Sequence, residues 1–297
     1  MTDTNAMTRY AVVGNPISHS KSPQIHKLFA QQTGETITYE PIESPLDKFQ
    51  QTVEKFFAAD GGGLNITVPF KEQAFALAKQ HSKRAQLAGA VNTLWHKDGL
   101  LYGDNTDGVG LVRDLKRHHI SLQGKHILLL GAGGAACGVL PDLLAEQPAA
   151  ITIANRTMKK ADAVVKKLKT IAKNNNVELQ AQEYSQLPAD KYELLINATS
   201  LSMHGKEPPV SPQVMATDCC CYDMWYDLSM EHTGKTTSAD VMGEKRSTKF
   251  QNWAKQNGAK TTLNGLGMLV EQAAESFYLW RNVQLEAKVI EQVIGKL

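Results

Sequence analysis

Residues 126–136 read HILLLGAGGAA, an apolar run that ends directly in a glycine-rich turn. The run His126–Leu130 predicts a buried strand, and the residues after the turn predict an apolar helix. A second apolar run, Ala150–Ala154, predicts the next strand. The order strand, glycine turn, helix, strand is that of a βαβ unit. This part of the chain is therefore predicted to be α/β with a parallel sheet.

Similar elements are predicted on the N-terminal side of this unit. Apolar runs at 11–13, 37–41 and 63–68 predict strands, and helical patterns cover 22–32, 45–58 and 109–117. A hairpin is predicted from strand 93–96 through the turn Lys97-Asp98-Gly99 to strand 100–102. This alternation predicts another α/β domain, also with a mostly parallel sheet.

On the C-terminal side, lysines recur at helical spacing over 159–173, which indicates the solvated face of a helix. Strands are predicted at 194–197 and 219–223, and the apolar positions of 268–283 suit a helix packed against another domain. The segment from Asp227 to Ser247 is polar and aperiodic, so a long surface loop is predicted there.

Composition limits the classes of function. The 297 residues favour two domains, and 42% apolar with 21% charged residues is typical of a globular protein. A formal net charge of +2 gives no electrostatic reason to expect a nucleic-acid or membrane partner. Residues 1–10 lack a signal-peptide pattern and predict a short disordered leader before a strand from Tyr10. The four cysteines, three of them adjacent, predict free buried thiols and no metal site.

The glycine turn predicts a phosphate site. Gly131, Gly133 and Ala136 fit the pattern G-x-G-x-x-A between a strand and a helix. The first glycine makes the tight turn, the second lets a pyrophosphate approach the backbone, and the third small residue lets helix and strand pack closely. The helix N-terminus then holds the phosphate. The alternative is a glycine turn that binds nothing.

The end of the next strand indicates which dinucleotide is bound. Asn155-Arg156-Thr157 stands where an NAD-specific site carries Asp or Glu for the ribose hydroxyls. Arginine can make forked hydrogen bonds to a 2′-phosphate, which lysine supports as a point charge. NADP is therefore favoured. Lys159 and Lys160 fit either this role or a solvated helix surface.

Four polar motifs lie at the ends of apolar segments in the first domain. They are residues 18–23 (SHSKSP), 65–71 (NITVPFK), 90–93 (AVNT) and 104–108 (DNTDG). In parallel sheets such loops gather outside the carboxyl ends of the strands, where ligands bind. Their hydroxyls, amides, ammonium and carboxylate suit a small polyhydroxylated acid.

Each of these motifs also has a structural explanation. Ser20 or Ser22 can cap a helix that starts near Pro23, and Asp107 can begin the helix that follows it. The amides of the second and third motifs can satisfy buried backbone groups, and Lys71 can point to water. The four structural explanations are much less convincing together than singly.

With these motifs in this order and spacing, the sequence resembles the shikimate dehydrogenase family over nearly its whole length. The resemblance rests on residues 19–23, 65–71, 89–93, 103–108, 131–135, 155–157, 197–200, 222–226 and 264–272. It implies a substrate domain formed by residues 1–106 and 265–297, to which a C-terminal helix returns, and a Rossmann-type NADP domain over 107–264. It further implies a cytoplasmic oxidoreductase, a monomer or homodimer. The implied reaction reduces 3-dehydroshikimate to shikimate on the way to chorismate and the aromatic amino acids.

The resemblance also implies roles for individual residues. Lys71 and Asp107 would form the catalytic pair. The substrate would be held by Ser20, Ser22, Asn65, Thr67, Lys71, Asn92, Asp107, Tyr226 and Gln272. The cofactor would be lined by Gly131, Ala132, Gly133, Gly134, Ala135, Asn155, Arg156, Thr157, Lys160, Thr199, Met224 and Gly265.

Two departures and two rival functions qualify this assignment. The insertion from Asp227 to Ser247 puts the loop geometry near Tyr226 in doubt, and Lys160 stands where the family often has arginine. An NAD-preferring quinate/shikimate dehydrogenase is disfavoured by Arg156. An NADP- and shikimate-binding sensor without turnover is disfavoured because it needs neither Lys71 nor Asp107. How these two residues divide the proton transfer is left open.

Overall fold

The computed structural model describes residues 7–227 and 247–297, and every structural statement below refers to them. The chain forms two compact units. The first comprises the N-terminal segment through His119, Cys137–Ala145 and Gly267–Leu297, and the second comprises Ile120–Ala136 and Glu146–Leu266. The functional domain boundaries implied by the resemblance, 106/107 and 264/265, stay a prediction.

The first unit is built on a six-stranded sheet in the order β2-β1-β3-β5-β6-β4. β1 is parallel to β2 and β3, and β4 to β6, whereas β5 runs antiparallel to β3 and β6. The elements are β1 (Thr8–Gly14), α1 (Ser22–Thr33), β2 (Ile37–Glu43), α2 (Phe49–Ala58), β3 (Gly61–Ile66), α3 (Lys71–Leu77), β4 (Gln80–His81), α4 (Lys83–Ala88), β5 (Thr93–Lys97), β6 (Leu100–Asp104), α5 (Asp107–Arg117), α9 (Leu266–Arg281) and α10 (Ala287–Gly295).

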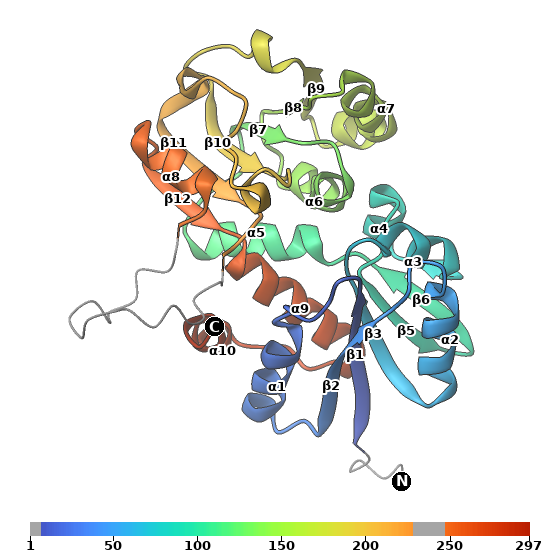
Figure 1. Ribbon diagram of the computed structural model, residues 1–297. Helices are drawn as coiled ribbons and strands as arrows, with labels where there is room; N and C mark the ends of the chain where they lie inside the picture. The colour runs from blue at the N-terminus through green and yellow to red at the C-terminus, as the bar shows by residue number, and fades with distance from the viewer. Residues whose placement is uncertain (1–6, 228–246) are drawn as a thin grey trace, which may run out of the picture. The chain divides into compact units, whose positions relative to one another are not determined.

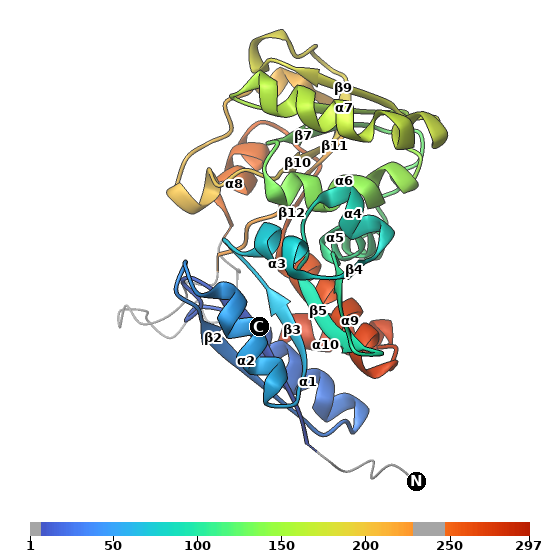
Figure 2. The same ribbon diagram turned by 90° about the vertical axis from the view of Figure 1, so that its right-hand side faces the viewer.

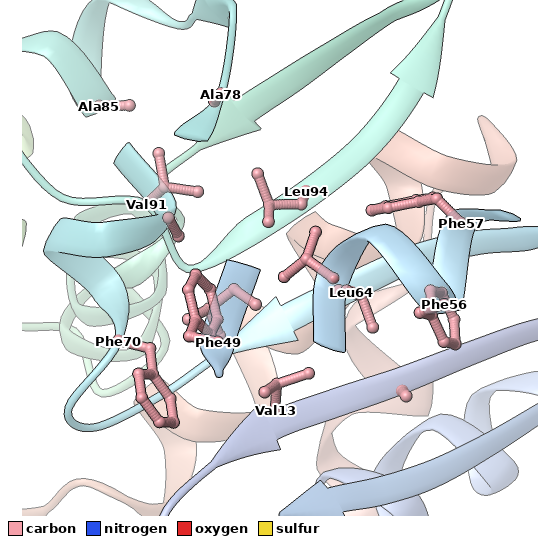
Figure 3. Close-up of a cluster of buried hydrophobic side chains, with 14 residues drawn as sticks. Val13, Phe49, Phe56, Phe57, Leu64, Phe70, Ala78, Ala85, Val91 and Leu94 are labelled. Carbon is pink, nitrogen blue, oxygen red and sulfur yellow. The ribbon is translucent and has the colours of Figure 1, made fainter. Parts of the chain in front are cut away.

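Apolar layers cover both faces of this sheet, because side chains alternate along each strand. Val13 and Leu64 pack with Phe49 of α2 on one face (Figure 3). A second cluster joins Ile25 of α1 to Phe277 of α9. Figures 1 and 2 show α1 and α2 on opposite sides of the sheet. The C-terminal helices thus pack within the first unit, which confirms this part of the predicted fold.

The second unit is a fully parallel six-stranded sheet in the order β12-β11-β10-β7-β8-β9. Numbered within the unit, this is the order 6-5-4-1-2-3 of a Rossmann fold, and the strand order reverses between β7 and β10. The predicted Rossmann-type fold is confirmed. The elements are β7 (His126–Leu130), the first three residues of α6 (Gly134–Ala145), β8 (Ala150–Ala154), α7 (Met158–Asn174), β9 (Glu178–Gln182), β10 (Tyr192–Asn197), β11 (Met215–Asp223), α8 (Lys249–Gln256) and β12 (Thr261–Asn264), with 3₁₀ turns at Tyr184–Gln186, Ser202–His204 and Pro212–Val214. The rest of α6, from Cys137, belongs to the first unit.

Several details differ from the sequence-based expectations. The first strand begins at Thr8, two residues before its predicted start, and residues 1–6 of the predicted leader lie outside the described residues. Helix α2 begins at Phe49, because residues 45–48 adopt a turn. Most of the predicted surface loop, residues 228–246, lies outside the described residues. Cys219, Cys220 and Cys221 are buried, as predicted, whereas Cys137 is half-buried, and none of the four forms a disulfide. In the described part of the chain, every helix is too short or too polar to cross a membrane.

Candidate active site

Lys71 and Asp107 form an ion pair in the first unit. Lys71 Nζ lies 2.5 Å from Asp107 Oδ2, and the side chains are 25% and 9% exposed. Each residue begins a helix: Lys71 starts α3, and Asp107 starts α5. The carboxylate therefore sits at a helix N-terminus, where the dipole favours negative charge. Of the two explanations for Lys71, the structure excludes an ammonium that merely points to water.

Asn92 ties this pair to the neighbouring loop. Its Nδ2 donates to Asp107 Oδ1 and to Thr106 Oγ1, each over 2.9 Å. Its Oδ1 accepts the backbone N–H of Thr106 over 2.9 Å. Gln272 of α9 joins the group, since its Oε1 accepts from Asn92 Nδ2 and Thr106 Oγ1, both at 3.3 Å. The structure thus brings four predicted residues, Lys71, Asn92, Asp107 and Gln272, into one hydrogen-bonded group.

Asn65 lies beside this group. Its Nδ2 donates to the Asn92 carbonyl and to the hydroxyls of Thr93 and Ser276, over 3.0–3.3 Å. Its Oδ1 accepts from the Tyr39 hydroxyl over 2.7 Å. Asn65 and Asn92 thus do satisfy buried backbone groups, as the structural explanation expected. These bonds account for only some of the hydrogen bonds that each amide makes.

Ser20 and Ser22 lie at the start of α1. The backbone N–H of Ser22 donates to Ser20 Oγ over 3.3 Å, whereas the N-cap position is Lys21 and makes no side-chain cap. Ser20 thus accepts one of the unpaired N–H groups at the start of α1, as the capping explanation expects, although neither serine occupies the N-cap position. The Ser22 side chain hydrogen-bonds Tyr39, whose pKa is raised well above its ordinary value by burial. Thr67 is half-buried after β3 and donates its N–H to Val13.

Arg84 fixes the loop that carries Asp107 by binding Asp104. Arg84 donates to both Asp104 carboxylate oxygens, over 2.8 and 2.7 Å, and to Glu275 over 2.9 Å. Asp104 accepts the N–H of Asn105, and Asn105 Oδ1 accepts the N–H of Asp107. A bidentate arginine pair of this kind gives geometric specificity as well as energy.

The glycine turn of the second unit fits a dinucleotide phosphate. Gly131 has φ +107°, a conformation that L side chains rarely adopt, and its N–H donates to the Ala154 carbonyl. A Cβ at Gly133 or Gly134 would meet nothing within 4 Å, and both glycines are exposed with Ala135. The backbone at the start of α6 is thus exposed at these glycines, which suits the close approach of a phosphate to a helix N-terminus. Ala132 lies buried between the glycines.

The end of β8 presents cations beside this turn. Asn155 Nδ2 donates to the Thr157 carbonyl over 2.9 Å, which shapes the bend before α7. Arg156, Thr157 and Lys160 are exposed. No acidic side chain occupies this bend, and the chemistry of these donors fits the 2′-phosphate of NADP.

The remaining predicted residues follow β10, β11 and β12. A Cβ added at Gly131 would lie 3.2 Å from Thr199 Cγ2, so Thr199 borders the glycine turn. Gly265 lies against Met224, where a Cβ would meet the Met224 carbonyl at 2.2 Å. Tyr226 stacks on Trp225, with ring centroids 5.8 Å apart, and belongs to the second unit. The other predicted substrate residues belong to the first unit.

Comparison with known proteins identifies the family. A model described as the shikimate dehydrogenase substrate binding domain matches residues 12–94. A shikimate/quinate 5-dehydrogenase model matches 114–207, and a shikimate 5′-dehydrogenase C-terminal domain matches 265–294. The protein named shikimate dehydrogenase (NADP(+)) from Hahella chejuensis is 50% identical over 279 residues, 94% of this chain and 95% of that protein. The chain belongs to the shikimate dehydrogenase family.

Other members of the shikimate dehydrogenase family match over the same length. The protein of that name from Psychromonas ingrahamii is 50% identical over 293 residues, 98% of each chain. The crystal structure of shikimate 5-dehydrogenase from Thermus thermophilus in complex with NADP(H) and shikimate superposes with a TM-score of 0.79 at 29% identity. The match covers 98% of this chain and 99% of that one.

Three polar residues of the site were not singled out from the sequence: Tyr39, Arg84 and Ser276. Ser276 follows Gln272 by one helical turn and donates to its carbonyl over 3.1 Å, so the spacing i, i+4 offered a signal. Tyr39 lies within a strand and Arg84 within a short charged helix, and neither position carries a motif.

Proposed function

We propose that this chain catalyses the reversible, NADPH-dependent reduction of 3-dehydroshikimate to shikimate. The observation that carries the proposal is the Lys71–Asp107 pair, set among the amides of Asn92 and Gln272. An ammonium next to neutral donors and acceptors suits a ketone flanked by ring hydroxyls. Family membership supports the same assignment.

The first unit supplies most of the groups that would bind substrate. Ser20, Ser22 and Thr67 are proposed to hold the carboxylate with Tyr226, whereas Asn65, Asn92, Asp107 and Gln272 take the ring hydroxyls. A site that hydrogen-bonds each hydroxyl rejects analogues that lack one, because its own polar groups are then left unpaired.

The second unit is proposed to hold NADP. The backbone N–H groups of Gly133 and Gly134 would bind the pyrophosphate and Arg156 the 2′-phosphate, with Asn155, Thr157, Lys160, Thr199, Met224 and Gly265 completing the site. When bound, NADPH supplies the hydride that reduces the ketone carbon.

Lys71 is proposed to transfer the proton. In reduction its ammonium gives a proton to the ketone oxygen as negative charge builds there, and in the reverse direction the amine takes that proton back. Asp107 holds Nζ in place through the 2.5 Å contact and orients a ring hydroxyl. The finer expectations, a cytoplasmic enzyme that is a monomer or homodimer, rest on the resemblance alone.

The test is steady-state turnover of shikimate and of quinate, each with NADP and with NAD. Shikimate with NADP should give the highest kcat/KM. A preference for NAD, or quinate used as well as shikimate, would favour the quinate/shikimate dehydrogenase alternative. Binding of shikimate and NADP without any turnover would favour the sensor.

A further inference from the structure

Asp223, the last residue of β11, is a buried carboxylate that the proposed reaction does not use. Its side chain is 0% exposed. Oδ1 accepts from Asn197 Nδ2 over 2.9 Å and from the N–H of Trp225 over 3.2 Å, and Oδ2 accepts from Ser202 Oγ over 2.6 Å. Thr248, which caps α8, adds a further hydrogen bond. Burial raises the pKa of this carboxyl above its ordinary value, and these neutral donors oppose the rise.

One arm of this network reaches the loop after β10. Asn197 lies opposite Asp223 in the parallel pairing of β10 with β11 and is 1% exposed. Its Oδ1 accepts both the backbone N–H and the hydroxyl of Thr199, over 3.1 and 2.6 Å. Asp223 fixes the Asn197 amide so that its oxygen faces Thr199, and Thr199 borders the glycine turn at Gly131.

The other arm reaches the loop after β11. The N–H of Trp225 donates to Asp223, and the N–H of Met224 donates to the Asn197 carbonyl over 3.0 Å. The Trp225 carbonyl in turn accepts the N–H of Gly265 over 3.1 Å. One carboxylate thus sets the backbone course of residues 224–226 and, through Asn197, that of residues 198–202.

We propose that Asp223 is a positioning residue that holds the 198–202 and 224–226 loops in the arrangement that binds NADP. The inference rests on the proposed function, since Thr199 and Met224 are assigned to the cofactor there. A carboxylate is needed because all its partners are donors. An asparagine accepts through one oxygen only. Its NH₂ group would either face the Asn197 amide and the Trp225 N–H, donor against donor, or force the Ser202 hydroxyl to accept instead of donate.

The experiment measures the dissociation constant for NADP by isothermal titration calorimetry, independently of turnover. Asp223→Asn should raise this constant by about 10-fold, the factor that 1.4 kcal/mol of lost positioning gives. The matched control is Asp218→Asn on the same strand. Asp218 is 75% exposed and pairs with Lys260 at the surface, so its replacement should change the constant less than about 2-fold. An unchanged constant in Asp223→Asn, or an equal rise in both variants, overturns the proposal.

A double-mutant cycle with Thr199→Ala separates positioning from a general structural role. If Asp223 acts through Thr199, the double variant should bind NADP only slightly more weakly than the weaker of the two single variants. If the double variant raises the dissociation constant by the product of the two single rises, the residues act independently and the proposal is contradicted. If Asp223→Asn fails to fold, Ser202→Ala replaces it, with an expected rise of about 3-fold and no rise contradicting the proposal. Failure of the unmodified protein to bind NADP would instead refute the proposed function.

Discussion

Lys71 Nζ lies 2.5 Å from Asp107 Oδ2, although the two residues are 36 positions apart in the sequence. The contact forms because β3 and β6 lie on either side of β5, so the loops that follow them meet at one edge. The Lys71 carbonyl also accepts the N–H of Val91 over 2.9 Å, which fixes the backbone that carries the ammonium. The pair is thus held by the sheet and by the loops around it.

Substitution of Gly138 in α6 can test the position of this pair. A Cβ at this position would lie 3.0 Å from Asp107 Oδ2 and 3.5 Å from Asn105 Nδ2. We expect Gly138→Ala to displace the Asp107 carboxylate and lower kcat by about 10-fold, because displacements of less than 1 Å are costly in catalysis. Steady-state kinetics at saturating substrates measures the effect.

Stability provides the control for this variant. Alanine within a helix is favoured over glycine by about 0.5–1 kcal/mol, so Gly138→Ala should not be strongly destabilised. Gly295→Ala in α10 meets nothing within 4 Å and should leave kcat unchanged. An unchanged kcat in Gly138→Ala would show that Asp107 tolerates the added methyl group.

Arg156 is expected to determine the choice of cofactor. Arg156→Ala should raise the KM for NADP far more than that for NAD, since a hydrogen bond to a charged group contributes about 1.5–3 kcal/mol. Lys173→Ala, at an exposed position of the same helical region, should change neither KM. Equal use of NADP and NAD by the unmodified enzyme would contradict the role given to Arg156.

The Arg84–Asp104 pair is expected to stabilise the fold. Asp104 is 3% exposed, and Asp104→Ala leaves Arg84 with Glu275 as its remaining partner. We expect a loss of about 3 kcal/mol in the free energy of unfolding in urea, as for other buried pairs. Glu40→Ala breaks the exposed Arg9–Glu40 pair and should cost at most about 1 kcal/mol. Similar losses in both variants would refute this ranking.

His26 should make stability depend on pH. It is fully buried and stacks on Tyr39, and its contact with the Asn65 side chain only partly opposes the effect of burial on its pKa. Burial lowers its pKa from 6.5 to about 3. Below pH 6.5 the unfolded chain therefore binds a proton that the folded chain does not, and stability falls as the pH falls toward 3.

The free energy of unfolding should fall by about 1.4 kcal/mol for each pH unit below 6.5, down to the folded-state pKa. His26→Phe keeps an aromatic ring against Tyr39 and should lose about 2 kcal/mol less than the unmodified protein between pH 7 and pH 5, since the slope applies only below pH 6.5. His204→Gln, at an exposed position, should retain the full slope. Parallel curves for His26→Phe and the unmodified protein would show that His26 does not titrate in this way.

Local patterns were enough to predict the Rossmann unit. β7 and β8 have the predicted bounds, because each is a continuous apolar run buried on both faces of a parallel sheet. β9 and β12 were missed because they are edge strands with half-exposed, polar sequences, in which burial leaves no clear period. Helix α8 was likewise missed, although Thr248 and Gln251 form its capping box.

The site was predictable as a set of motifs but not as a network. Lys71, Asn92 and Asp107 lie in polar stretches that end apolar runs, which is a local signal. Tyr39 and Arg84 reach the site only through tertiary pairing, as in the bond between Tyr39 and Asn65, 26 positions away. No spacing in the sequence reports such a contact.

The central claim is that Lys71 transfers the proton, and the kinetics of Lys71→Ala at saturating shikimate and NADP test it most directly. Removal of a general acid–base group should lower kcat by about 10²–10⁴, with little change in KM. Lys71→Arg should not restore the rate, since arginine does not readily release its proton. The same fall in kcat is therefore expected for both variants. A raised KM with kcat within a few-fold of the original would show that Lys71 only binds substrate, and would contradict it.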